Sequence, residues 1–216
     1  MPTDLIHPDA IPPANRERVR SELGILSGDT VVTMVSRVIR SKGVLEFAKA
    51  AEIVRQRDPS VKFVLVGPAD RDSLDRLNDE EAAQLRRTVA WLGSRDDVKT
   101  LLSASHIFVL PSFYREGIPR ALIEAAAMGL PLVTTNVPGC REVVEHGTNG
   151  FIVSPRDSNS LAEAVLRLTQ DVNTRQRFGA ESRRRAVAIF DLSRVAERLT
   201  QVYWELLASK KMLTVT

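Results

Sequence analysis

Six short, mostly apolar runs recur along the chain and constrain its fold more than any other feature. They are Thr30 to Val35, Val61 to Val66, Val89 to Leu92, Ile107 to Leu110, Leu132 to Thr135 and Phe151 to Val153. Continuously apolar strands are typical of a parallel sheet that helices cover on both faces. Segments with helical periodicity separate the runs, most clearly Val44 to Arg57. The sequence therefore predicts an α/β fold with a Rossmann-like, doubly wound parallel sheet.

Further helices are expected between and after the strands. One ends near Gly24, and the others cover about Glu80 to Arg87, Val98 to Ser103, Pro119 to Met128 and Leu161 to Leu207. Residues 1–28 are interpreted as an interdomain linker or docking arm with a short helix. The stretch up to about Asn15, with prolines at positions 2, 8, 12 and 13, is not expected to be core. Residues 29–190 form the predicted Rossmann-like domain, and residues 191–216 form a final helix and tail.

Composition narrows the classes of function. The net charge is +3, from 30 Lys and Arg against 27 Asp and Glu, and no basic segment is interleaved with the few aromatic residues. Nucleic-acid binding is therefore not expected. The only cysteine, Cys140, allows no intramolecular disulfide and favours a reducing, cytoplasmic location. No pair of histidines has the spacing of metal ligands, so neither a metal ion nor another cofactor is expected.

Membrane contact stays open at the sequence level. No apolar run is long enough to span a bilayer, and the first residues lack the pattern of a leader. The helical tail carries Arg175, Arg177, Arg183, Arg184 and Arg185. These arginines form either a solvated helix face or a surface for anionic lipid head groups, which would hold the protein at the cytoplasmic face of a membrane.

The segment from Pro111 to Glu124 has the features of an anion site. Proline is favoured at the first position of a helix, where an N–H would lack a helical partner anyway, so Pro119 marks the predicted helix start. The amides around Gly117 and Ile118 then face the carboxyl ends of the strands, together with the positive end of the helix dipole. Because Gly117 has no side chain, a ligand can approach the backbone closely. These features favour a phosphate group.

Two carboxylates flank this turn. Glu116 lies just ahead of the predicted helix, and Glu124 lies about a turn and a half inside it. Carboxylates repel a phosphate, so they are better explained as acceptors for neutral hydroxyl groups, such as those of a sugar and a ribose. In the alternative interpretation, Glu116 only adds charge at the helix N-terminus and Glu124 lies on the surface.

A second loop, Ser36 to Gly43, carries Arg37 and Lys42 ahead of another helix. Two cations in such a loop suit a diphosphate, although basic loop residues are often only solvated. Gly67 and the stretch from Leu92 to Arg95 follow the next two strands and are well placed to offer backbone groups to a nucleobase. Turn chemistry explains these last positions equally well.

With these loops, the chain resembles the C-terminal domain of retaining glycosyltransferases of family 4, whose GT-B architecture has two facing Rossmann-like domains. The resemblance extends from about Val31 to Leu207, and its specific part is the pair Glu116 and Glu124. It also includes Arg37, Lys42-Gly43, Phe63 to Gly67, Trp91-Leu92-Gly93, Leu110-Pro111-Ser112, Gly129 to Val133, Gly147 to Phe151 and Val202-Tyr203.

The resemblance implies roles for individual residues. Arg37 and Lys42 would bind the donor diphosphate and stabilise it as it departs, without an essential metal ion, and Glu116 would hold the sugar hydroxyls at the reacting centre. Glu124 would bind the ribose. The remaining donor-binding positions are Gly117, Ile118 and Pro119 beside the sugar and phosphate, and Gly67, Leu92 and Arg95 beside the base.

The variants Tyr114 to Arg120 and Pro138 to Glu142 resemble the branch of this family that builds capsule, O-antigen or glycan chains on polyprenyl-diphosphate carriers. The expected donor is a UDP-sugar, and the expected transferred group is a hexose or an N-acetylhexosamine. No acceptor domain is recognisable ahead of Thr30, so one is expected in the same or a separate chain, and this chain alone is expected to be inactive. The last helix resembles the one that crosses back to that domain.

Two other functions are compatible with the sheet. A non-catalytic nucleotide-binding subunit would dock through the N-terminal arm and the last helix. A dinucleotide-dependent dehydrogenase shares the sheet type, but no Gly-x-Gly-x-x-Gly motif follows the first strand.

Overall fold

The computed structural model describes residue 3, residues 6–115 and residues 117–213, with side chains up to residue 207. The described strands form one sheet in the order β3-β2-β1-β4-β5-β6, and all its pairings are parallel. The strands are β1 (Thr30–Val35), β2 (Val61–Val66), β3 (Ala90–Trp91), β4 (Ile107–Leu110), β5 (Leu132–Thr135) and β6 (Gly150–Val153). The predicted doubly wound α/β fold is confirmed.

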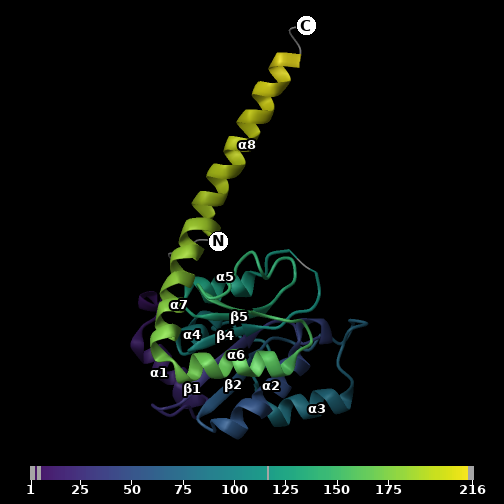
Figure 1. Ribbon diagram of the computed structural model, residues 1–216, viewed down its shortest axis with the longest axis vertical. Coiled ribbons are helices and arrows are strands. Elements are labelled where there is room, and N and C mark those ends of the chain that lie inside the picture. Colours follow the sequence, from purple (N-terminus) through teal and green to yellow (C-terminus); the bar gives the residue numbers. More distant parts are fainter. Residues whose placement is uncertain (1–2, 4–5, 116, 214–216) are drawn as a thin grey trace.

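Helices pack around this sheet (Figure 1). Helix α2 contacts both α3 and α6, while α1 contacts α4 and α5 contacts α7. The helices are α1 (Pro13–Glu22), α2 (Val44–Arg57), α3 (Asp79–Thr88), α4 (Val98–Ser103), α5 (Arg120–Ala127), α6 (Ser158–Gln170), α7 (Val172–Arg185) and α8 (Leu192–Leu213), with short turns η2 (Pro8–Ala10), η3 (Arg40–Lys42) and η4 (Ala186–Phe190). The strand order reverses between β1 and β4, which is where sheets of this kind bind ligands.

Pro119 and Val89 lie at element boundaries that differ from expectation, and the helical stretch predicted from Leu161 to Leu207 is divided into α6, α7, η4 and α8. Pro119 precedes α5 as its N-cap, with an extended backbone, and is not the first helical residue. Strand β3 is shorter than the predicted Val89 to Leu92 because the Val89 N–H bonds to the carbonyl oxygen of Leu85 and closes the end of α3. The shortened strand still pairs with β2 through Val64 and Leu65.

Described residues of the N-terminal segment pack against the domain, and the expectation that the stretch up to about Asn15 is not core is wrong for Ile6. Ile6 is buried in the main hydrophobic cluster, and Val19 of α1 is fully buried in a second one. The guanidinium of Arg183 donates to the carbonyl oxygens of Thr3 at 2.9 Å, Ile6 at 2.7 Å and Ala127 at 2.8 Å. Proline content predicted an irregular backbone, but an irregular backbone can still bury its apolar side chains.

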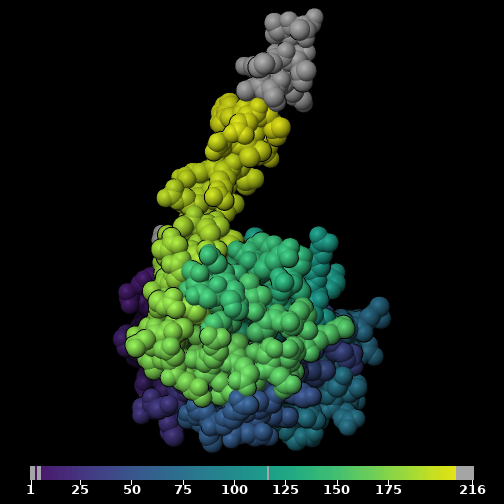
Figure 2. Space-filling view, viewed as in Figure 1, coloured from purple at the N-terminus to yellow at the C-terminus, as the bar shows by residue number. Residues whose placement is uncertain are grey.

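Helix α8 extends away from the body of the domain (Figures 1 and 2). It follows the π-helical turn η4, and within the described part of the chain many of its apolar side chains up to residue 207 are exposed. The exposed ones are Leu192, Val195, Leu199, Val202, Tyr203, Trp204, Leu206 and Leu207. Among the described residues, none of the helices combines the length and apolar character needed to cross a bilayer.

The arginines of the helical tail contact the protein itself. Arg175 donates to the carbonyl oxygen of Leu168, Arg177 lies over the ring of Phe178, Arg183 bonds to the N-terminal segment, Arg184 pairs with Glu181, and Arg185 pairs with Glu145. Arg183 and Arg185 therefore join α7 to other parts of the fold, whereas the exposed Arg177 and Arg184 contact residues of their own helix.

His106 is expected to make stability depend on pH. Its Nδ1 accepts the Val31 N–H at 2.9 Å, and burial, together with the charges of Arg175 and Arg20, lowers its pKa from 6.5 to about 4. The unfolded chain takes up a proton near pH 6.5 while native His106 stays neutral, so its contribution is complete above pH 6.5 and is lost as the pH falls toward 4. Allowing for partial exposure, urea unfolding should show a loss of roughly 1–2 kcal/mol between about pH 7 and 4.5. The variant His106→Gln should lose less free energy of unfolding over the same pH range. Parallel plots of unfolding free energy against pH for the variant and the parent chain would contradict this role of His106.

Candidate functional site

The loops after β1 and β4 meet at the carboxyl edge of the sheet. The carbonyl oxygen of Ser41 accepts the N–H of Phe113 at 2.9 Å and the hydroxyl of Ser112 at 3.2 Å. Gly43 has a φ of 77°, and a Cβ there would lie 2.2 Å from the carbonyl oxygen of Pro111. Only glycine permits this approach. The two loops that the sequence marks as anion sites are therefore in direct contact.

A pocket of about 470 Å³ lies between these loops. It is lined by Arg37, Ile39, Ser41, Lys42, Ser73, Asp75 and Tyr114. The two predicted cations, Arg37 and Lys42, thus share one pocket with Tyr114, whose ring is largely exposed. The predicted sugar-binding residue Glu116 lies outside the described residues.

Helix α5 begins at the same edge of the sheet. Pro119 supplies no side-chain cap, and Gly117 and Ile118 before it are exposed. A Cβ added to Gly117 would meet none of the described atoms within 4 Å, so a ligand has room there. The carboxylate of Glu124, 17% exposed, accepts the Nε–H of Arg120 at 2.8 Å. Glu124 is thus partly buried on the helix whose N-terminus faces the proposed phosphate position.

A third loop, residues 67–78, borders the pocket, and beyond Gly67 no motif in the sequence singled out any of its residues. Asp70 forms an ion pair with Arg37, with 2.7 Å between Nη1 and Oδ2. The side chain of Asp75 accepts the Ser41 N–H at 2.7 Å. In the sequence, three aspartates (Asp70, Asp72 and Asp75) follow closely on the predicted strand Val61 to Val66, at the sheet edge where ligands bind. This group of acidic residues could have marked the loop as part of the site.

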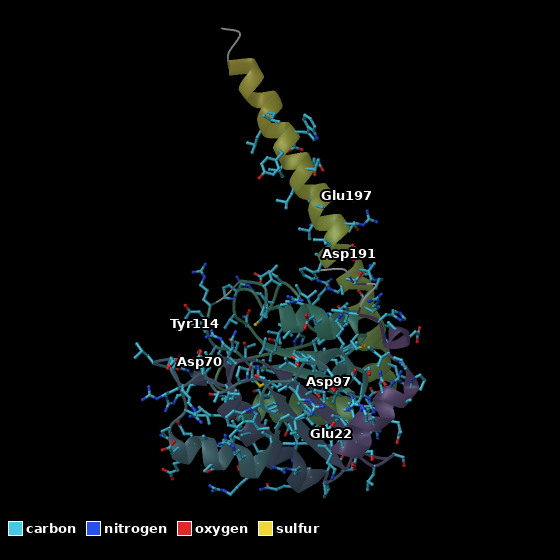
Figure 3. The ribbon with its side chains drawn as sticks, turned by 180° about the vertical axis from the view of Figure 1, so that it is seen from behind. Glu22, Asp70, Asp97, Tyr114, Asp191 and Glu197 are labelled. Atoms are coloured by element: carbon cyan, nitrogen blue, oxygen red, sulfur yellow. The ribbon has the colours of Figure 1, made fainter. Side chains whose placement is uncertain are left out.

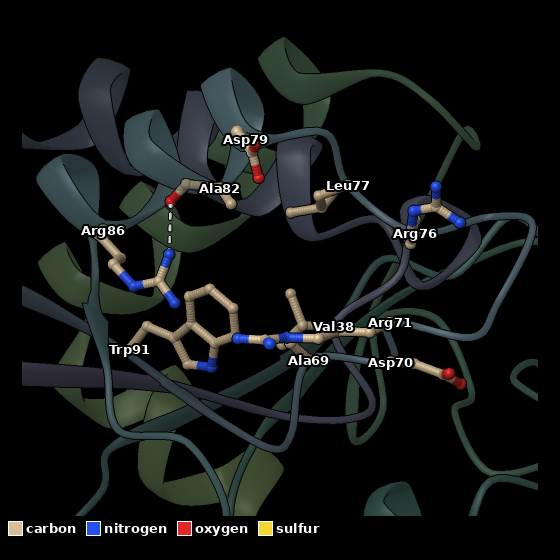
Figure 4. Close-up of a pocket in the computed structure, with 10 residues that line it drawn as sticks. All are labelled: Val38, Ala69, Asp70, Arg71, Arg76, Leu77, Asp79, Ala82, Arg86 and Trp91. Carbon is tan, nitrogen blue, oxygen red and sulfur yellow. Dashed lines mark hydrogen bonds between the residues drawn. The ribbon is translucent and has the colours of Figure 1, made fainter.

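A second pocket, of about 560 Å³, lies next to loop 67–78 (Figure 4). Its lining residues are Val38, Ala69, Asp70, Arg71, Arg76, Leu77, Asp79, Ala82, Arg86 and Trp91. The guanidinium of Arg86 lies 4.2 Å from the centre of the Trp91 ring. Across the part of the chain that the structure describes, no group of three or more His, Cys, Asp and Glu side chains is arranged to hold a metal ion.

Gly67 and Leu92 use their backbone groups inside the fold. The Gly67 N–H donates to the carbonyl oxygen of Gly93 at 2.8 Å, and its own carbonyl oxygen accepts the Trp91 Nε1–H at 2.9 Å. The Leu92 N–H donates to Leu65 of β2 at 2.9 Å. Neither residue lines the two pockets described above. The structure therefore supports the turn interpretation of these positions.

Arg95 is also separate from the Arg37 pocket. Its guanidinium donates to Glu22 of α1 at 3.1 Å and to Asp97 at 2.9 Å, and this contact lowers the pKa of Asp97. In Figure 3, Glu22 and Asp97 lie away from Asp70 and Tyr114. Arg95 joins α1 to the loop after β3, a packing role that the sequence did not indicate.

Comparison with known proteins identifies the family. A model described as glycosyl transferases group 1 matches residues 15–185, a range that includes every strand of the sheet. The chain belongs to this family. The resemblance drawn from the loop motifs is confirmed at this level.

Relatives and solved structures agree with the assignment. An Escherichia coli UDP-Gal:alpha-D-GlcNAc-diphosphoundecaprenol alpha-1,3-galactosyltransferase is 30% identical over 190 residues, which cover 87% of this chain and 49% of that protein. Anabaena Alr3699/HepE in complex with UDP-glucose is 27% identical, with a TM-score of 0.81 over 95% of this chain and 56% of that one. The C-terminal domain of the group 1 protein LpcC from Francisella tularensis, 20% identical, shares the fold with a TM-score of 0.75 over 89% of this chain and 99% of that domain. The chain spans about half the length of the curated relatives it matches.

The close approach at Gly43 can be tested against a matched glycine. Both Gly43 and Gly93 have positive φ, at 77° and 69°, but only Gly43 has backbone atoms where a Cβ would lie. Gly93→Ala should cost about 1 kcal/mol from backbone strain alone, whereas Gly43→Ala should cost about 3 kcal/mol or more. Urea denaturation measures both, and equal losses would show that the contact with Pro111 is not what requires glycine.

Proposed function

We propose that this chain is the donor-binding domain of a retaining glycosyltransferase. It binds a UDP-sugar, and the transferred group is a hexose or an N-acetylhexosamine. The acceptor is a glycan or a polyprenyl-diphosphate-linked saccharide in polysaccharide biosynthesis. The observation that carries the proposal is the pocket that Arg37 and Lys42 share with Tyr114, where the loops after β1 and β4 are bonded together.

Diphosphate recognition follows from the chemistry of this pocket. The planar guanidinium of Arg37 can donate two parallel hydrogen bonds to phosphate oxygens, and Lys42 adds a compact charge. The uncapped N-terminus of α5 offers amides and the positive end of its dipole. When the bond between the sugar and the diphosphate breaks, negative charge grows on the diphosphate, and these groups stabilise it. No metal ion is needed for that step.

The carboxylates complete the proposed donor site. Glu116 holds hydroxyl groups of the sugar and is not a covalent nucleophile, because the leaving phosphate assists attack from the same face. Glu124 accepts hydrogen bonds from the ribose. Its partial burial supports a role beyond that of a surface charge, since a carboxylate shielded from water needs hydrogen-bond donors.

The relatives support the substrate classes. The E. coli protein is named for UDP-Gal and a diphosphoundecaprenol acceptor, and the Anabaena structure holds UDP-glucose. We extend these classes to the complete protein to which this chain contributes. A polyprenyl-linked acceptor would place that protein in the cytoplasm, at the membrane face.

A second, acceptor-binding domain completes the proposed enzyme, in the same or another chain, and this chain alone is inactive. The coverage of about half of each curated relative supports such a domain, and the exposed apolar residues of α8 suit its docking. The same helix suits the alternative of a non-catalytic nucleotide-binding subunit. Transfer activity after an acceptor domain is supplied would distinguish the enzyme from that subunit.

Calorimetric titration with UDP, GDP, ADP and uridine tests the donor site. UDP should bind most tightly of the four. Arg37→Gln and Lys42→Gln should each weaken UDP binding about five- to tenfold but change uridine binding less than twofold, because the lost charge acts on the diphosphate. If the folded chain binds none of these nucleotides, the proposal is wrong.

Ribose recognition by Glu124 has its own test. Glu124→Ala should weaken UDP about tenfold, as expected for a lost hydrogen bond to a charged group, but should hardly affect a 2′,3′-dideoxy analogue of UDP. Arg120→Ala is the matched control because it removes the partner of Glu124 and keeps the carboxylate. Equal UDP affinity for Glu124→Ala and the parent chain would rule out this role.

A further inference from the structure

Arg37, which lines the 470 Å³ pocket, is paired with a carboxylate where a diphosphate needs positive charge. This carboxylate belongs to Asp70, which lines the adjoining 560 Å³ pocket. Asp70 Oδ2 lies 2.7 Å from Arg37 Nη1, and the Arg37 side chain is 60% exposed while that of Asp70 is 22% exposed. The exposed guanidinium of Arg37 is therefore paired with a carboxylate, that of Asp70, which is more buried than the guanidinium. One of the two cations proposed to bind the diphosphate is neutralised before any ligand arrives.

Asp70 is fixed in this position by its loop. Its other oxygen, Oδ1, accepts the Ser73 N–H at 3.2 Å. Loop 67–78 is joined to the loop after β1 by the backbone bonds from Val38 to Pro68 and from Arg40 to Asp75, both 2.9 Å long. The backbone bonds hold loop 67–78 beside the loop after β1, and the bond from the Ser73 N–H orients the Asp70 carboxylate toward Arg37.

A carboxylate so placed can either orient the arginine or compete for it. Ion pairs between exposed side chains contribute little free energy, so the benefit of orienting Arg37 is small. A diphosphate bound to the same guanidinium carries more than one negative charge close to Asp70, so its repulsion by this carboxylate exceeds the small benefit of orienting Arg37. Competition is therefore the larger effect.

We propose that Asp70 is a counter-charge to Arg37 that weakens the hold of this pocket on nucleoside diphosphates. The inference rests on the proposed function, and Asp70 is a positioning residue because it acts through Arg37. Donor and product both carry the diphosphate, but only the donor also makes contacts through its sugar. Asp70 therefore favours release of the spent nucleoside diphosphate, a step that limits many enzymes.

Asp70→Asn tests the inference, because asparagine removes the charge and keeps an oxygen for the Ser73 N–H. In calorimetry at low salt, UDP should bind about five- to tenfold more tightly than to the parent chain, and uridine should change less than twofold. The gain for UDP should shrink in about 0.5 M salt, where charges are screened. A change confined to the charged ligand separates an electrostatic role from a loss of folding.

The matched control is Asp72→Asn. Asp72 is exposed on the same loop and has no hydrogen-bond or ion-pair partner among the residues that the structure describes. The Asp72→Asn variant loses the same charge as Asp70→Asn, and its affinity for UDP should differ from that of the parent chain less than twofold. An equal gain in both variants would overturn the inference, because the effect would then be one of net charge only.

The remaining outcomes separate this inference from the proposed function. If Arg37→Gln weakens UDP binding while Asp70→Asn leaves it unchanged or weaker, Asp70 merely orients Arg37 and the inference alone is wrong. If the folded parent chain binds no UDP, the proposed function fails and the inference fails with it.

Discussion

The close approach of the backbone at Gly43 to Pro111 holds the candidate site together. Parallel pairing of β1 with β4 brings their carboxyl ends to one edge of the sheet, and the shared carbonyl oxygen of Ser41 then joins the loops that leave them. Arg37 and Tyr114 come from different loops, so their common pocket exists only while this contact is intact. Because Gly43 has no side chain, the two loops can approach closely enough to form one site.

Charge in this pocket is balanced. Lys42 lines the pocket with Arg37, while aspartates of loop 67–78 pair with Arg37 and with the N–H of Ser41. A purely cationic pocket would hold a diphosphate more tightly, whereas the proposed enzyme must also release its product. Loop 67–78 therefore combines two effects: it supports the loop after β1 through backbone bonds and moderates the charge that this loop presents.

Secondary structure was largely predictable because the central strands are mostly buried, β4 and β5 completely, and so appear as apolar runs. The errors have local physical causes. Val89 was expected in β3, but its N–H closes the end of α3. Ile6 was expected outside the core because of the prolines around it, yet an isolated apolar side chain in an irregular segment can fill a gap between helices.

The sequence by itself determined the alternation of buried strands and helices, the helix start after Gly117 and Ile118, and the residue types suited to a diphosphate. These are local properties of periodicity, capping and charge. Only the tertiary structure decided that Asp70 neutralises Arg37, and that the backbone groups of Gly67 are used inside the fold. The physical reason is that parallel crossovers bring residues far apart in the chain to one edge of the sheet, so their ion pairs and hydrogen bonds depend on the assembled fold.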